Sequence, residues 1–155
     1  EVYRLVSEVL AEGMGRFGIA SGFALERRGS PRNPDCFATT GEYELATADG
    51  RKLVGSAQAT TRRASLQHGS IPLDGSFRRV SAYLRVDGSG SGLTPTSIGE
   101  ELGREVSLEE AVEVFAAAFG RRFGVEPSTL TQAEEEMAGA LESGKYASDA
   151  WTLMY

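Results

Sequence analysis

One short segment of the sequence places three polar side chains of different chemistry on a single face of a predicted strand. Alternate residues of a strand face the same way, so Lys52, Ser56 and Gln58 share one face. Gly55 and Ala57 lie between them and are small enough to let a ligand approach the backbone. The lysine would supply a point charge for a carboxylate or a phosphate. The same pattern is typical of the solvated side of a half-buried sheet, so both interpretations stay open.

Three residue types that carry chemistry are rare in this chain. Only Lys52 and Lys145 are lysine among 16 basic residues, and Cys36 and His68 are the single cysteine and the single histidine. A cysteine thiolate beside a cation is a nucleophile, and a histidine can change charge near neutral pH. Each also has a structural interpretation, because a free cysteine is often a small buried hydrophobe and a lone strand histidine is often packed. One cysteine and one histidine are too few for the usual zinc site, so we expect no metal.

Length, composition and charge exclude several classes of protein. With 155 residues, of which 41% are hydrophobic and 25% charged, the chain has the size and composition of one folded domain. A formal charge of −6 argues against a nucleic-acid binder. The sequence contains no apolar run long enough for a transmembrane helix and no signal-peptide pattern, so we expect a cytoplasmic protein that does not bind membranes. It also lacks a Gly-x-Ser-x-Gly elbow and a phosphate-binding Gly-x-x-x-x-Gly-Lys loop.

The first half of the chain is predicted to form a helix and an antiparallel sheet. Apolar residues spaced three and four apart predict a helix over Val2–Phe17 that ends at Gly18. The turn signal Asp49-Gly50 predicts a hairpin. The predicted strands are Ile19–Leu25, Glu42–Thr47, Arg51–Thr60 and Ala64–Leu73. On the third strand, the residues expected to face the core are Leu53, Gly55, Ala57 and Ala59.

The second half is predicted to be helical. A short helix is expected at Phe77–Val86, followed by a flexible Gly/Ser segment. Three later segments have capping-box spacing and begin at Ser97, Ser107 and Thr131. The last helix is expected to end near Ser143, with Gly144 after it. The chain is thus α+β, with residues 1–86 as a sheet-containing part, 87–95 as a flexible loop and 96–155 as a helical C-terminal part.

Five segments carry a pattern that runs through most of the chain. They are Pro34-Asp35-Cys36-Phe37, Tyr43-Glu44-Leu45, Gly50-Arg51-Lys52-Leu53-Val54-Gly55-Ser56-Ala57-Gln58, Leu66-Gln67-His68-Gly69-Ser70-Ile71 and Lys145-Tyr146-Ala147-Ser148-Asp149-Ala150-Trp151. In this order they resemble the lipoate/octanoate attachment family, which comprises lipoate–protein ligases and octanoyltransferases and shares a fold with biotin ligases. The resemblance implies an antiparallel β-sheet with flanking helices, corresponding to the later part of such a catalytic domain.

The resemblance implies transfer of an octanoyl or lipoyl group to a lysine of lipoyl domains. The lysine matching Lys52 would contact the activated acyl carbonyl, and the cysteine matching Cys36 would carry a thioester intermediate. The residues that would line the acyl pocket are Gly55, Ser56, Ala57, Gln58, His68 and Gly69. The donor would be acyl carrier protein, and the acceptor would be a lipoyl domain of a 2-oxoacid dehydrogenase or the glycine cleavage H protein. This octanoyl transfer would require no cofactor.

Two alternatives stay open, and one departure from the family pattern favours the second of them. Catalytic domains of the family carry an earlier Arg-Arg-x-x-Gly-Gly motif, whereas Arg27-Arg28-Gly29-Ser30 follows the first predicted helix and lacks the glycine run. The first alternative is an ATP-dependent lipoate–protein ligase that forms lipoyl-AMP and in which Cys36 is structural. The second is a non-catalytic acyl- or partner-binding fragment that needs a separate N-terminal half or self-association.

Overall fold

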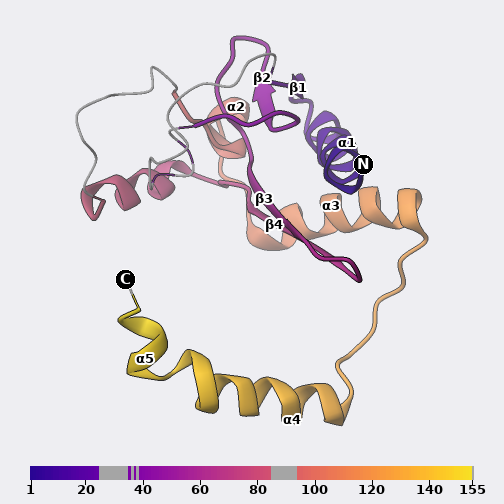
Figure 1. The fold of residues 1–155 in the computed structure, drawn as a ribbon. Helices are drawn as coiled ribbons and strands as arrows, with labels where there is room; N and C mark the ends of the chain where they lie inside the picture. Colours follow the sequence, from indigo (N-terminus) through magenta and orange to yellow (C-terminus); the bar gives the residue numbers. More distant parts are fainter. Residues whose placement is uncertain (25–34, 36, 38, 85–93, 155) are drawn as a thin grey trace. The chain divides into compact units, whose positions relative to one another are not determined.

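The computed structural model describes residues 1–24, 35, 37, 39–84 and 94–154, which form two compact units. Unit 1 is Glu1–Gly124 and unit 2 is Val125–Tyr155 (Figure 1). Helices and small antiparallel sheets make up unit 1, which confirms the predicted α+β class. The predicted flexible loop at 87–95 lies mostly outside the described residues, so the three-part division stays a prediction. Within the described part of the chain, no helix has the length and apolar character needed to cross a bilayer.

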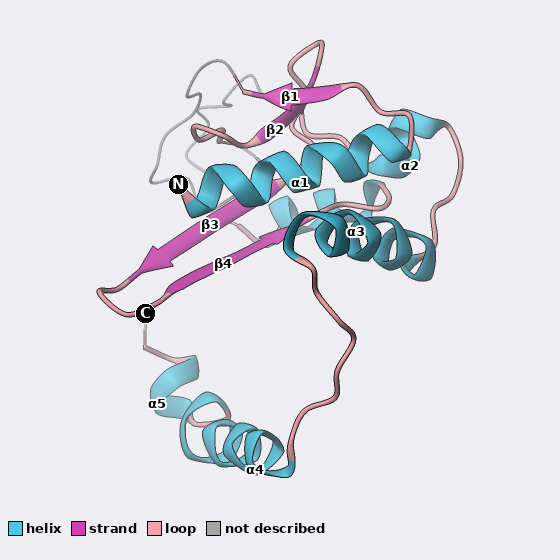
Figure 2. Ribbon diagram, turned by 90° about the vertical axis from the view of Figure 1, so that its right-hand side faces the viewer, coloured by secondary structure: helices cyan, strands magenta, loops and turns pink. Residues whose placement is uncertain are grey.

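Two helices of unit 1 pack against each other. Helix α1 (Val2–Arg16) ends before Gly18, whose φ of 82° is the left-handed conformation expected after a helix. Helix α3 (Leu108–Phe123) contacts α1 (Figure 2), and Gly13 lies against the Phe115 ring, with which an added Cβ would collide. The first predicted helix is therefore confirmed, and a glycine inside it permits the tight crossing.

Four short strands pair as two separate two-stranded sheets. Strand β1 (Ser21–Phe23) pairs antiparallel with β2 (Leu45–Thr47). Strand β3 (Gly55–Thr60) pairs antiparallel with β4 (Ser65–Ser70), with Gly55 opposite Ser70. Figures 1 and 2 both show the tip of the β3–β4 hairpin extending away from the helices of unit 1.

The predicted strand Arg51–Thr60 is wrong as a single element, because a bulge interrupts it. The Asp-Gly turn forms as expected, but the N–H groups of Leu53 and Val54 both donate to the carbonyl of Leu45, at 2.9 and 3.4 Å. Two residues opposite one make a β-bulge, which bends the chain and breaks the alternation of faces. Beyond the bulge the chain leaves β2 and pairs with β4 instead.

The bulge also overturns the predicted assignment of faces. Leu53 and Val54, expected on opposite faces, are both buried, at 0% and 1% exposure. Ala57 and Ala59, expected to face the core, are exposed along the hairpin. Strict period-two alternation therefore holds only within β3 and not from residue 52 onward.

The predicted helix Phe77–Val86 is a 3₁₀ helix, η1, over Gly75–Ala82, and Asp74 caps it by accepting from the Ser76 N–H. Helix α2 (Ile98–Leu102) begins with the predicted capping box of Ser97 and Glu100. The side-chain oxygen of Ser107 likewise accepts from the N–H of Glu110 at the start of α3. Unit 2 has a capping box at Thr131. All three predicted capping positions, at Ser97, Ser107 and Thr131, are therefore confirmed.

Unit 2 holds the last two helices of the chain. Helix α4 (Gln132–Leu141) continues directly into a π-helical turn, η2 (Glu142–Tyr146), and α5 (Asp149–Thr152) follows. The predicted stop at Gly144 is wrong, because this glycine lies inside the π-helical turn and the chain stays helical through it.

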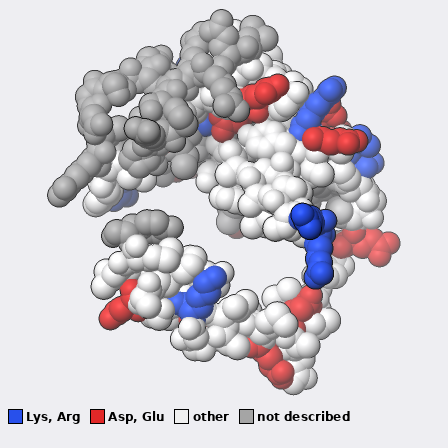
Figure 3. All heavy atoms as spheres, viewed as in Figure 1, with Lys and Arg blue, Asp and Glu red and all other residues white. Residues whose placement is uncertain are grey.

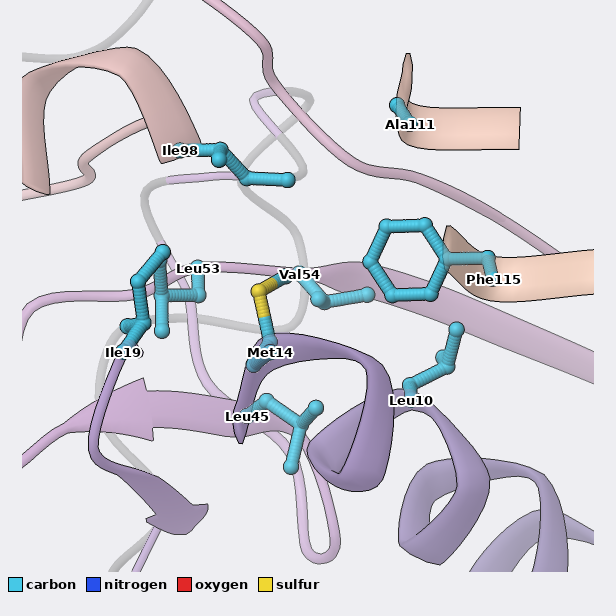
Figure 4. Packing of buried hydrophobic residues seen from close by; sticks show 9 residues of the cluster. All are labelled: Leu10, Met14, Ile19, Leu45, Leu53, Val54, Ile98, Ala111 and Phe115. Carbon is cyan, nitrogen blue, oxygen red and sulfur yellow. The ribbon is translucent and has the colours of Figure 1, made fainter. Parts of the chain in front are cut away.

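The core of unit 1 joins the first helix to segments far along the chain. Figure 4 shows Met14 of α1 among side chains from β2, from the bulge and from α2 and α3. The members of this cluster are Leu10, Met14, Ile19, Leu45, Leu53, Val54, Ile98, Ala111 and Phe115. Because the bulge residues Leu53 and Val54 belong to it, the core fixes the segment that carries Lys52.

Candidate functional site

Lys52 lies in the interior of unit 1, with a side chain that is 1% exposed. Its backbone bridges Ala46 on one side and Pro95 on the other, and its carbonyl accepts from the Thr96 N–H at 2.9 Å. Segments of the same chain therefore hold the Lys52 backbone on both sides. The interpretation of Lys52 as part of a solvated sheet face is wrong, since the bulge turns this part of the strand inward.

The Lys52 ammonium has charged and polar neighbours in the interior. Its Nζ lies 2.9 Å from Oε2 of Glu44, and it donates to the carbonyl of Thr39 at 2.5 Å. The Phe37 ring centroid is 5.8 Å from Nζ. A buried charge is stable only when it is paired and hydrogen-bonded, and these contacts meet that condition. The lysine head thus faces the segment that follows Cys36 in the sequence.

Glu44 is the counter-ion of Lys52 and also accepts two backbone hydrogen bonds. Its Oε2 accepts from the N–H of Gly41 at 2.6 Å, and its Oε1 accepts from the N–H of Ser56 at 3.2 Å. Burial, followed by the Glu44 charge, raises the pKa of Tyr3, whose hydroxyl donates to the Ser56 carbonyl. Sequence analysis placed Glu44 in the Tyr43-Glu44-Leu45 segment but assigned no role to its carboxylate.

The residue before Glu44 has an unusual backbone conformation. Tyr43 has a φ of 66°, and among the described residues every other positive φ belongs to a glycine. Its ring packs against Phe23 and Tyr3, with centroids 5.6 and 6.4 Å away. A bulky side chain is rare in this left-handed region, and such conformations cluster at functional sites.

A cavity of about 180 Å³ lies between the β3–β4 hairpin and the helices α1 and α3. Three of the six predicted pocket residues line it, namely Ser56, His68 and Gly69. The other lining residues are Val6, Leu10, Val54, Gln67, Ile71 and Phe119. The lining is thus mostly apolar, as a pocket for an alkyl chain requires.

The remaining predicted pocket residues lie elsewhere on the hairpin. Gly55 is buried at the base of β3, whereas Ala57 and Gln58 are exposed. In the register, Ala57 lies opposite His68 and Gln58 lies opposite Gln67. Their assignment to an acyl pocket stays a prediction.

Two further residues of the hairpin have a geometric reason for their identity. An added Cβ on Gly69 would lie 2.5 Å from the Gly55 carbonyl oxygen, so a side chain does not fit there. Gln67 lines the cavity, and both polar atoms of its buried amide lack a hydrogen-bond partner within the described part of the chain. A buried amide without a partner is uncommon and indicates a place where a ligand or water supplies the missing bonds.

Cys36 lies outside the described residues, but both of its neighbours are described. The Phe37 N–H donates to Oδ1 of Asp35 at 2.8 Å, across the position of the cysteine. Both residues line a cavity of about 390 Å³, together with Ser70, Ile71, Pro72, Phe77, Val80 and Leu84. The chain on either side of the predicted nucleophile therefore borders a mostly apolar cavity.

The last motif of the sequence forms an aromatic cluster within unit 2. The Lys145 Nζ lies 5.0 Å from the Tyr146 ring centroid and 4.6 Å from that of Trp151, which is within the range of cation–π attraction. The two rings meet edge to face at 5.0 Å. The residues described by the structure include no group of three or more His, Cys, Asp or Glu side chains placed to hold a metal ion.

Comparison with known proteins places this geometry in a family. Residues 1–120 match the family profile "Lipoyl protein ligase A/B catalytic domain". Octanoyltransferase LipM of Symbiobacterium thermophilum is 36% identical over 99% of this chain and 61% of its own length. The same-named protein of Bacillus subtilis is 32% identical over 97% of this chain and 60% of its own length. The chain thus spans about 60% of the length of these curated relatives.

Solved structures with the same fold are lipoate–protein ligases. One is lipoate-protein ligase A bound with ATP, with a TM-score of 0.71 and 19% identity over 97% of this chain and 57% of that one. Another is a bi-partite lipoate protein ligase from Thermoplasma acidophilum, described with its E2 lipoyl domain. Its TM-score is 0.61, with 16% identity over 97% of this chain and 56% of that one.

Proposed function

The chain belongs to the lipoyl protein ligase A/B catalytic domain family, and we propose that the protein carrying it transfers an octanoyl group from acyl carrier protein to a lysine of lipoyl domains. The observation that carries this proposal is the buried Lys52 ammonium, which donates to the Thr39 carbonyl in the segment that follows Cys36. The relatives named octanoyltransferase favour transfer over ligation. The acceptors we propose are lipoyl domains of 2-oxoacid dehydrogenases or the glycine cleavage H protein.

In the first half-reaction, the Cys36 thiolate attacks the thioester carbonyl of the octanoyl carrier protein. A carbon–sulfur bond to Cys36 forms, and the carrier thiolate leaves with the electron pair of the bond that breaks. The carbonyl oxygen carries a negative charge in between, and the Lys52 ammonium stabilises that charge. Loss of one such donor lowers kcat by about a hundredfold to a thousandfold in other enzymes.

In the second half-reaction, the neutral ε-amine of the acceptor lysine attacks the Cys36 thioester. An amide bond forms, the Cys36 thiolate leaves, and the surplus amine proton passes to solvent. The same ammonium serves both steps, because each passes through a tetrahedral intermediate at the same carbonyl carbon. A thioester is already activated towards amines, so this route uses no ATP.

The cavity between the β3–β4 hairpin and the helices supports the acyl-pocket part of the proposal. Its apolar lining would remove the octanoyl methylenes from water, and each buried methylene contributes roughly 0.8 kcal/mol. Ser56, His68 and Gly69 line this cavity. We keep Gly55, Ala57 and Gln58 as proposed pocket residues of the complete protein.

Two alternatives have their own support. An ATP-dependent lipoate–protein ligase would need ATP and lipoate and would form lipoyl-AMP, and the ATP-bound structural relative favours it. A non-catalytic acyl- or partner-binding role, completed by a separate N-terminal half or by self-association, is favoured by the mostly apolar cavity, which would bind an acyl chain without catalysis.

Intact-mass spectrometry tests the proposal in the complete protein. Incubation with octanoyl carrier protein, without ATP, should add one octanoyl mass that hydroxylamine removes, and Cys36→Ser should abolish this adduct. A serine hydroxyl without a dedicated base is a far weaker nucleophile. If the variant still octanoylates a lipoyl domain, and does so only with ATP, the ligase alternative replaces the thioester mechanism.

A further inference from the structure

Within the described residues, the buried Glu44 carboxylate has three polar contacts. The Lys52 ammonium and two backbone N–H groups all donate to it, at 2.6 to 3.2 Å, and its side chain is 7% exposed. The two N–H groups belong to Gly41 and Ser56, which lie on either side of the β2 strand and the bulge in the sequence. The carboxylate therefore joins the lysine to both ends of the segment that presents it.

The chemistry of these three neighbours requires a carboxylate. All three are donors, and an ionised carboxylate is a pure acceptor with two oxygens. A glutamine of the same shape would turn an NH₂ group toward one donor and would also lose the charge that offsets the ammonium. A buried ammonium without a counter-ion is strongly disfavoured in an apolar interior.

We propose that Glu44 is a positioning residue, which holds the Lys52 ammonium in place and directs it at the segment following Cys36. This inference rests on the proposed function, because it assigns to Glu44 the task of holding the group that stabilises the oxyanion. In this proposal Glu44 acts through Lys52 and is not itself a catalytic residue. Its contribution to turnover therefore vanishes when Lys52 is absent.

A double-mutant cycle in the complete protein measures this dependence. Glu44→Gln should lower kcat for octanoyl transfer by about tenfold or more, towards the roughly hundredfold loss expected for Lys52→Met, with little change in the KM for the acyl donor. Glu44→Asp keeps the charge and should recover part of the loss. The double variant Glu44→Gln/Lys52→Met should be no slower than Lys52→Met alone.

The neighbouring ion pair provides a matched control. Arg51 contacts Glu101 at 2.5 Å, and the Glu101 side chain is 12% exposed, but this pair lies outside the proposed machinery. Glu101→Gln should therefore keep kcat within about twofold of the wild type. The double variant also guards against misfolding, because it removes both buried charges and should fold better than Glu44→Gln.

The state of the lysine is visible without turnover. In protein labelled with ¹⁵N at lysine Nζ, the Lys52 signal, assigned by its loss in Lys52→Met, should report an ammonium in wild type and Glu44→Asp. In Glu44→Gln the Lys52 signal should change, because the ammonium loses the carboxylate that holds it.

The outcomes separate this inference from the proposed function. Wild-type turnover of Glu44→Gln beside an inactive Lys52→Met overturns the positioning role alone. An additional loss in the double variant also overturns it, because Glu44 would then act independently of Lys52. Wild-type turnover of Lys52→Met overturns both the inference and the catalytic role of the lysine.

Discussion

At the scale of single residues, the site depends on a charge that the fold has removed from water. Lys52 is 1% exposed, and its ammonium has Glu44 and the Thr39 carbonyl as neighbours. Removing one partner of a buried ion pair costs about 3–5 kcal/mol of stability, because the other charge stays buried without compensation. Both charges of the pair therefore stabilise the fold only together. Removing Glu44 should disturb the geometry of the pair as much as removing Lys52.

The unpartnered amide of Gln67 leads to a prediction about stability. Gln67→Leu removes two buried polar atoms that lack hydrogen-bond partners among the described residues, so it should raise the free energy of unfolding by about 1 kcal/mol. Denaturant unfolding measures this change. Gln58→Leu, at the exposed position opposite in the register, is the matched control and should change stability little. A destabilised Gln67→Leu would mean that water satisfies the amide in solution.

The residue types of the site were only partly predictable from the sequence. Lys52 could be selected because lysine is rare in this chain, and its burial adds weight to that choice. Glu44 belongs to a recognised segment, but its contact with Lys52 was not predictable, because it spans the Asp49-Gly50 turn and depends on how the strands pair. Cys36 lies outside the described residues, so its role as nucleophile stays a prediction.

At the scale of elements, one bulge decides how the site is presented. The double hydrogen bond to the Leu45 carbonyl turns Lys52 inward and directs the following residues into the β3–β4 hairpin. Local patterns predicted the helices and their caps well, since these depend on neighbouring residues. The bulge and the π-helical turn depend on tertiary packing, so period-two alternation and a glycine stop signal failed at these two points.

The close approach of β3 and β4 makes Gly69 a test of the hairpin. Gly69→Ala would place a Cβ 2.5 Å from the Gly55 oxygen and 3.1 Å from the Ser56 Oγ, so the strands must separate. We expect a loss of about 1–3 kcal/mol in the free energy of unfolding, as for other overpacked sites. Gly22→Ala in β1, where a Cβ meets nothing within 4 Å, is the control and should be close to neutral. Equal stabilities for the two variants would refute the tight register.

The contact between η1 and α2 gives a pH-dependent prediction. Hydrogen bonds from Arg78, and next from Ser97, lower the pKa of Glu100 below its ordinary value of 4.5. A lowered pKa in the folded state means that the stabilisation is complete above pH 4.5 and is lost as the pH falls through the lowered pKa. Glu100→Gln should therefore be less stable than wild type near pH 7, with a difference that shrinks in acid.

Denaturant unfolding from pH 7 to about pH 3 measures this convergence. Glu113→Gln, at an exposed position of α3, should instead follow the wild-type curve. A stability difference between wild type and Glu100→Gln that stays constant with pH would show that the glutamate acts through its shape alone.

At the scale of the whole molecule, unit 1 contains the ion pair, the cavity and the chain on both sides of Cys36. On the face seen in Figure 3, the Lys and Arg side chains of the described residues are interspersed with Asp and Glu, without a broad patch of one sign.

The central claim is that Cys36 and Lys52 form one site, and the alkylation rate of Cys36 as a function of pH tests it most directly. An isolated cysteine thiol has a pKa of about 8.5, and a neighbouring ammonium lowers it. In the complete protein, mass spectrometry of the Cys36 peptide should show an alkylation rate that rises with pH. The pH at the midpoint of this rise should lie below that value. The midpoint should rise toward it in Glu44→Gln/Lys52→Met and stay nearly unchanged in Glu101→Gln. Equal midpoints in the wild type and the double variant would contradict a shared site.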